Sequence, residues 1–241
     1  MFATRWALIL TLVTGLQAPL WGTPIAHEKF YPALASWPSG KSPGVIVLHS
    51  SRGYKSLRDR PEVYVKAGYV VYTPDFFDRH GLHKNNRFET WTVHPEAIET
   101  ELKEIVEIMC QDPVVDANNI FAVGYSNEGY WAAYLAASGL VKAGAAFYGV
   151  WDFPGNSYGY PAFYFKESSH PLLALIGRRD SIQRYERVMP QVSVAQRRSP
   201  RLVLQEFDAE HSWDCSGSPT REAEVTRQAI EKTLSFFKEQ Q

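Results

Sequence analysis

The stretch that decides the fold is FAVGYSNEG, residues 121–129. Residues 119–124 form an apolar run typical of a strand buried on both faces, and residues 129–137 continue in the small-residue pattern of a buried helix. A serine at the junction of such a strand and helix is typical of a nucleophile elbow, a sharp turn that lifts the serine oxygen out of the sheet. The pattern therefore predicts Ser126 as a nucleophile.

The turn in a nucleophile elbow brings backbone segments close together, so small residues usually stand two places before and two places after the serine. Gly124 meets this requirement, Glu128 does not, and the next glycine is Gly129. An ordinary strand-to-helix turn could carry the same residues. The motif therefore needs support from the rest of the chain.

Strand and helix patterns alternate on both sides of this motif. Short apolar runs predict strands at residues 45–49, 69–73, 119–124, 143–148, 172–177 and 201–207. Helical spacing predicts helices at residues 62–66, 96–109, 129–137 and 222–237. Such alternation predicts an α/β fold with a mostly parallel central sheet flanked by helices on both faces. Residues 23–43, which carry several prolines and no clear period, are expected to wrap the core irregularly.

The N-terminal segment, the length and the net charge limit the possible domain organisation and partners. Lone Arg5, the apolar run 6–16 and the small residues after it predict a signal peptide over residues 1–22, hence export to the periplasm or medium. An N-terminal anchor and a buried first helix are the alternatives. Residues 23–241 suffice for one domain. With a net charge of −1, the protein has no overall positive field that would attract nucleic acid or an anionic membrane. Stable membrane insertion is not expected.

Cysteine and histidine usage gives no sign of a metal site or a cofactor. Cys110 and Cys215 could pair or stand as two unpaired buried thiols, and the sequence leaves both readings open. His80, His83 and His94 share one segment, but their spacing matches no standard zinc pattern. We interpret them as solvent-facing or pocket-lining side chains.

Two later loops supply the partners that a serine nucleophile needs, a histidine to take its proton and a carboxylate to orient that histidine. Asp180 follows the predicted strand 172–177, and His211 follows the predicted strand 201–207. Asp180 could instead cap a helix, and His211 could be a surface histidine. The order nucleophile, acid, histidine, each after a strand, favours a catalytic triad of Ser126, Asp180 and His211.

An acyl-transfer site also needs two backbone donors for the developing oxyanion. We predict the N–H of Asn127, directly after the nucleophile, and the N–H of Ser51, in the loop after the first predicted strand. The alternative for that loop is a simple Ser/Gly-rich connection.

These motifs together resemble the dienelactone hydrolase family, which belongs to the α/β-hydrolase superfamily. The resemblance runs from Gly44 to the last helix and rests on five segments: residues 45–53, 67–76, 124–129, 176–180 and 209–212. It implies the α/β-hydrolase fold and hydrolysis of a carboxylic ester or related acyl bond through an acyl-enzyme. It implies a small-molecule ester substrate and no cofactor, and says nothing of oligomeric state.

The chain departs from the family pattern at three positions. The name-giving members use a cysteine nucleophile where this chain has Ser126, and often carry a glutamate where it has Ser50. These two changes argue for a conventional serine–histidine mechanism. Glu128, in place of glycine, could distort the elbow or bring a carboxylate to the site.

The substrate pocket and the rival functions are less well defined. Aromatic residues gather in the segment 151–165, which could wall an apolar pocket or form a satellite cluster of the core. We expect Tyr125 and Trp151 to line the pocket. Arg79 and Arg87 could bind a substrate carboxylate or simply be solvated. Because of Glu128, a catalytically inactive binding protein is the alternative function. An exopeptidase would need a further domain.

Overall fold

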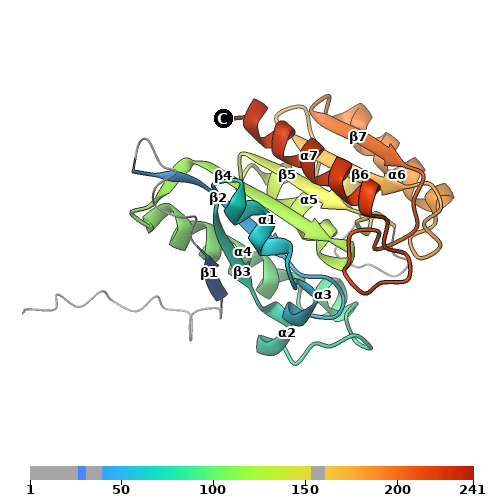
Figure 1. Ribbon diagram of the computed structural model, residues 1–241, viewed down its shortest axis with the longest axis horizontal. Helices are drawn as coiled ribbons and strands as arrows, with labels where there is room; N and C mark the ends of the chain where they lie inside the picture. Colours follow the sequence, from blue (N-terminus) through green and yellow to red (C-terminus); the bar gives the residue numbers. More distant parts are fainter. Residues whose placement is uncertain (1–26, 31–39, 153–160) are drawn as a thin grey trace, which may run out of the picture.

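One sheet organises the part of the chain that the structure describes. This computed structural model describes residues 27–30, 40–152 and 161–241. Seven strands within them lie in the order β1-β3-β2-β4-β5-β6-β7, and all pair in parallel except β1, which is antiparallel to β3 (Figure 1). The strands are β1 (His27–Phe30), β2 (Ser42–Leu48), β3 (Val70–Pro74), β4 (Val115–Tyr125), β5 (Ala143–Phe147), β6 (Leu172–Gly177) and β7 (Leu202–Phe207).

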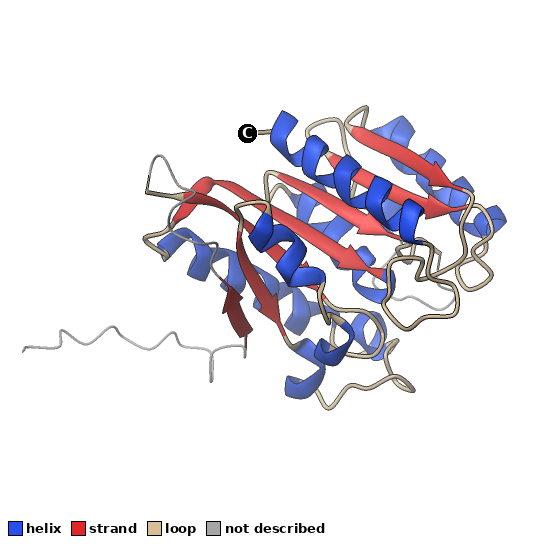
Figure 2. Ribbon diagram, in the orientation of Figure 1, coloured by secondary structure: helices blue, strands red, loops and turns tan. Residues whose placement is uncertain are grey.

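Helices cover both faces of the sheet, so the predicted α/β-hydrolase architecture is confirmed. They are α1 (Arg60–Lys66), α2 (Phe76–Arg79), α3 (Glu89–Thr92), α4 (Pro95–Gln111), α5 (Gly129–Ser138), α6 (Tyr185–Arg198) and α7 (Ala223–Glu239). The helices α1 and α7 pack on one face, and α4, α5 and α6 pack on the other (Figure 2).

Alternating side chains of each strand build the two halves of the core. Val45 and Val47 of β2 face the cluster that includes α1 and α7, whereas Ile46 and Leu48 face the cluster that includes α4 and α5. All four side chains are fully buried. Such strands must be apolar on both faces, which is why they appear in the sequence as continuous apolar runs.

Several elements differ from the sequence-based expectation, among them the short helices α2 and α3, for which no helix was predicted. The strand β1 lies inside the segment that we expected to be irregular; an edge strand with the letters HEKF has too few apolar residues to be read as a strand. The helix α6 was not predicted. It carries Pro190 in its interior and buries only Val188, Val192 and Ala195. Its sequence therefore lacks the uninterrupted apolar period by which a helix is recognised.

The cysteines do not pair. Cys110 is exposed on α4 and Cys215 lies half-buried in the loop before α7, so the disulfide alternative is wrong, and so is the reading that both thiols are buried. The predicted signal peptide, residues 1–22, lies outside the described residues. In the described ranges no helix has the length and hydropathy that crossing a bilayer requires.

Candidate active site

The three predicted triad residues meet at the carboxyl edge of the sheet. Ser126 directly follows β4, Asp180 stands three residues after β6, and His211 stands four residues after β7. Because β4, β6 and β7 are parallel members of one sheet, their carboxyl ends lie along the same edge. Residues that are 31 and 85 positions apart in the chain therefore come into contact.

A strained backbone turn presents Ser126. Tyr125 is extended, Ser126 has a φ of 54°, and a single 3₁₀ turn then leads into α5. A Cβ atom on Gly124 would lie 2.1 Å from the carbonyl oxygen of Glu128, which leaves room only for glycine. The predicted elbow is therefore present, because a strand passes into a helix within one residue of the serine.

A continuous hydrogen-bond chain joins the three side chains. Ser126 Oγ lies 2.9 Å from His211 Nε2, and His211 Nδ1 lies 2.7 Å from Asp180 Oδ2. With the Nδ1–H directed at the carboxylate, Nε2 is free to accept the serine proton. The other carboxylate oxygen accepts the backbone N–H groups of Ile182 at 2.9 Å and Gln183 at 2.8 Å, so Asp180 is fixed in place.

An open cleft of about 840 Å³ lies over this chain. Ser126 and His211 line the cleft, and so do both predicted oxyanion residues, Ser51 and Asn127. The structure thus brings the serine, the histidine and the two predicted donor residues together on one cavity wall. This arrangement is suited to acyl transfer, because the candidate nucleophile, its candidate base and the two predicted donor residues border the same space.

Comparison with known proteins agrees with this geometry. The model of the dienelactone hydrolase family matches residues 30–241. The chain belongs to the dienelactone hydrolase family. Its membership confirms the predicted family and the predicted enzyme class, a hydrolase that acts on ester bonds. A search of curated protein sequences finds no match.

Solved structures of low sequence identity share the fold. A candidate dienelactone hydrolase from Klebsiella pneumoniae is 18% identical, with a TM-score of 0.71 over 88% of this chain and 99% of that one. A propionate-bound esterase 2 from Thermogutta terrifontis is 16% identical, with a TM-score of 0.68 over 88% of each chain. A sugar hydrolase from Lactococcus lactis is 13% identical, with a TM-score of 0.71 over 91% of this chain and 96% of that one.

Glu128, the departure from the family's elbow, neither distorts the turn nor enters the cleft. Its side chain is fully buried, and Oε1 accepts a hydrogen bond of 3.0 Å from Nδ2 of Asn127. Burial raises the pKa of Glu128 to about 8, so the carboxyl group is protonated at neutral pH. The close backbone contact that glycine usually allows is made one place later, where Gly129 packs on Gly149.

The expectation for Tyr125 and Trp151 is corrected. Tyr125 is 2% exposed and packs in the core beside Phe147, while Trp151 is 1% exposed and stacks on Phe165. Neither is among the residues that line the cleft. Side chains alternate along a strand, so a residue next to a cleft residue such as Ser126 points into the interior. The aromatic residues in 153–160 lie outside the described residues.

The expectation for Arg79 is also corrected, because its guanidinium is occupied elsewhere. Arg79 Nε pairs with Glu101 at 3.0 Å, and His80 Nε2 lies 2.9 Å from the same carboxylate oxygen. Arg87, in contrast, lies on the cleft wall. His80 stacks on His94. No group of three metal-ligating side chains occurs in the described parts of the chain.

The sequence analysis missed the basic character of the cleft. Its walls include five cationic side chains for which the described residues provide no ion pair: Arg52, Lys55, Arg58, Lys84 and Arg87. They come from the loops that follow β2 and β3. The sequence does contain two groups of Lys and Arg after predicted strands. The net charge of the whole chain is close to zero and therefore does not reveal them.

The two acidic groups on the cleft wall are too few to neutralise these five cations. Asp152 pairs with Arg187 at 2.7 Å. Glu210 accepts hydrogen bonds from the backbone N–H and hydroxyl of Ser181, at 3.1 and 3.0 Å. The cleft therefore carries a local positive field, although the chain as a whole is close to neutral.

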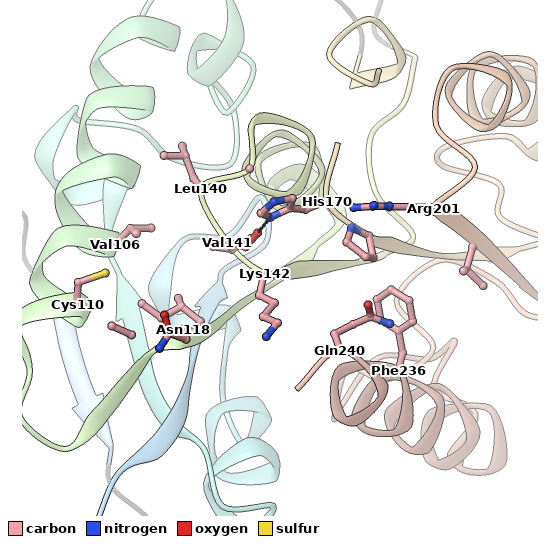
Figure 3. A pocket seen from close by; sticks show the side chains of 15 residues that line it. Val106, Cys110, Asn118, Leu140, Val141, Lys142, His170, Arg201, Phe236 and Gln240 are labelled. Atoms are coloured by element: carbon pink, nitrogen blue, oxygen red, sulfur yellow. Dashed lines mark hydrogen bonds between the residues drawn. The ribbon is translucent and has the colours of Figure 1, made fainter. Parts of the chain in front are cut away.

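A second cavity, of about 770 Å³, lies at the opposite end of the strands, beside the amino ends of β5, β6 and β7 (Figure 3). It is bordered by residues that precede β5, β6 and β7, among them Lys142, His170 and Arg201. The triad residues are absent from its lining, and ligands of open α/β sheets bind at the carboxyl ends of the strands. The cleft over Ser126 is therefore the candidate active site.

The buried acid Glu128 gives a prediction about stability. In the unfolded chain its carboxyl ionises near pH 4.5, whereas the folded chain keeps the proton up to about pH 8. The folded state therefore loses stability relative to the unfolded state as pH rises between these values. Glu128→Gln abolishes this loss, and the variant should exceed the wild type at pH 8 by an amount on the order of 3 kcal/mol.

Denaturant unfolding at pH 5 and pH 8 measures this effect. The control is Glu210→Gln: hydrogen bonds from Ser181 lower the pKa of Glu210, so this acid is ionised at both pH values and the stability difference between Glu210→Gln and wild type should be nearly the same at pH 5 and pH 8. Equal stability differences between Glu128→Gln and wild type at both pH values would contradict a protonated Glu128.

Proposed function

We propose that the protein is a serine esterase that works through an acyl-enzyme on Ser126. The observation that carries the proposal is the 2.9 Å contact between Ser126 Oγ and His211 Nε2, with Asp180 behind the imidazole. His211 takes the hydroxyl proton while Ser126 Oγ bonds to the ester carbonyl carbon. Collapse of the tetrahedral intermediate breaks the bond to the alcohol oxygen, which receives that proton from His211.

Deacylation repeats these steps with water. His211 removes a proton from a water molecule as the water oxygen attacks the acyl carbon, and Ser126 leaves with that proton restored. In both halves the oxyanion is proposed to accept the backbone N–H groups of Ser51 and Asn127. Support for this role comes from the presence of both residues in the lining of the cleft that Ser126 also lines.

The alternative of an inactive binding protein rested on Glu128. That side chain is turned into the interior, and the turn at Ser126 keeps the positive φ that exposes the hydroxyl. An inactive member would also have no need of a buried carboxylate aligned on His211. These features favour an enzyme over a binding module.

We further propose that the preferred esters carry a negative charge. The five cations around the cleft that form no ion pair attract an anionic substrate, whereas a neutral substrate would offer them no opposite charge. An anionic acyl group therefore gains binding energy that a neutral acyl group of equal length does not.

The nucleophile is tested by replacing Ser126. Ser126→Ala should lower ester turnover by roughly 10²-fold to 10⁴-fold, because the covalent route is lost. Hydrolysis of a short nitrophenyl ester measures turnover, and mass spectrometry after fluorophosphonate treatment locates the labelled residue. Ser138→Ala, at the far end of α5, is the control and should behave as wild type. Undiminished turnover by Ser126→Ala would refute the proposal.

The substrate charge is tested with two esters of similar length. The nitrophenyl monoester of a dicarboxylic acid should have a kcat/KM about tenfold above that of the uncharged nitrophenyl pentanoate, and added salt should reduce the difference. Arg58→Glu combined with Lys84→Glu should abolish this preference. Lys232→Glu, an exposed residue of α7, should leave it intact. A preference for the neutral ester in wild type would contradict an anionic substrate.

A further inference from the structure

A buried ion pair lies directly behind the catalytic histidine. Arg60, at the start of α1, donates from Nε to Asp214 Oδ2 at 2.8 Å and from Nη2 to Asp214 Oδ1 at 3.0 Å. Asp214 stands three residues after His211. The two side chains are only 7% and 5% exposed, so this bidentate contact is almost wholly removed from water.

Tyr148 connects this ion pair to the imidazole. Its hydroxyl accepts a hydrogen bond of 2.7 Å from Arg60 Nη2 and donates one to Asp214 Oδ1. Burial raises the pKa of Tyr148, so the phenol keeps the proton that it donates. The ring packs edge-on against His211, with 4.6 Å between the ring centroids. One face of the histidine is thus held by a side chain that the ion pair fixes.

The same guanidinium also fixes the loop of the proposed oxyanion hole. Arg60 Nη1 donates to the carbonyl oxygen of Ser56 at 3.1 Å. The hydroxyl of Ser56 in turn donates to the carbonyl of Gly53 at 2.7 Å and accepts the N–H of Ser50 at 3.0 Å. Ser51 lies within the turn that these bonds close.

Stability alone does not account for so many contacts on one arginine. Removing an ion pair from water costs about as much as the attraction returns, and an apolar pair of similar volume often serves a core equally well. A bidentate pair does fix the relative position of two segments, because its geometry tolerates little displacement. Here the two segments carry the proposed general base and a proposed oxyanion donor.

We propose that Arg60, Asp214 and Tyr148 are positioning residues that hold His211 and the Ser51 loop in register around Ser126. This inference rests on the proposed function. A displacement of about 1 Å in such an array can cost 10²-fold in rate, whereas substrate binding by the outer cleft would change little. The loss should therefore fall on kcat rather than on KM.

The test compares two variants of this cluster with a variant of a partly buried ion pair elsewhere. Asp214→Asn should lower kcat by about 10-fold to 100-fold with KM within about threefold of wild type. Tyr148→Phe, which keeps the ring on His211 and removes only the hydroxyl, should lower kcat by about 3-fold to 10-fold. Glu101→Gln removes a 6% exposed carboxylate that faces Arg79, away from the cleft, and should keep kcat within about twofold.

All variants are assayed at pH 8 and at a temperature where circular dichroism shows them folded. A purely structural role predicts equal kcat values for Asp214→Asn and Glu101→Gln per folded molecule, and that result would overturn the inference. Should Asp214→Asn fail to fold, Tyr148→Phe decides alone, and an unchanged kcat in that variant counts against it.

Measuring wild type and Ser126→Ala in the same series distinguishes a failure of the proposed function from a failure of the positioning role. Absence of Ser126-dependent turnover in wild type defeats the proposed function itself. Ser126-dependent turnover that neither Asp214→Asn nor Tyr148→Phe reduces defeats only the positioning role.

Discussion

The site depends on one backbone constraint, the left-handed conformation of Ser126 at the junction of β4 and α5. A positive φ costs a residue other than glycine on the order of 1–3 kcal/mol, so it persists only where the surroundings enforce it. Here Gly124 lies against the carbonyl of Glu128, and the carbonyl of Ser126 accepts the N–H of Val150. Chain direction changes within one residue, and the hydroxyl consequently faces the cleft.

Parallel pairing in the sheet then supplies the partners of the serine. The carboxyl ends of β6 and β7 lie on the same side of the sheet as that of β4. Short loops after β6 and β7 are therefore enough to join Asp180 and His211 in one hydrogen-bond chain with Ser126. Local contacts then fix the two side chains: two backbone N–H groups hold the Asp180 carboxylate, and Tyr148 packs on the His211 imidazole. The side chains proposed to react are thereby ordered before any substrate binds, as preorganised catalysis requires.

Sequence reasoning succeeded where one local pattern determines one feature. Continuous apolar runs identified the central strands, and the serine between strand and helix identified the elbow. It failed for β1 and α6, whose burial depends on neighbours rather than on their own periodicity. Tyr125 and Trp151 were misplaced because the sequence gives proximity to the site but not the direction of a side chain. The Arg60–Asp214 contact joins residues 154 positions apart, and no motif marks either one.

The most direct test of the central claim is a crystal structure of the protein after reaction with paraoxon. The geometry predicts phosphorus bonded to Ser126 Oγ, with the phosphoryl oxygen about 2.7–3.1 Å from the backbone nitrogens of Ser51 and Asn127. Phosphorus on another residue, or an adduct on Ser126 whose oxygen points away from both amides, would contradict the account.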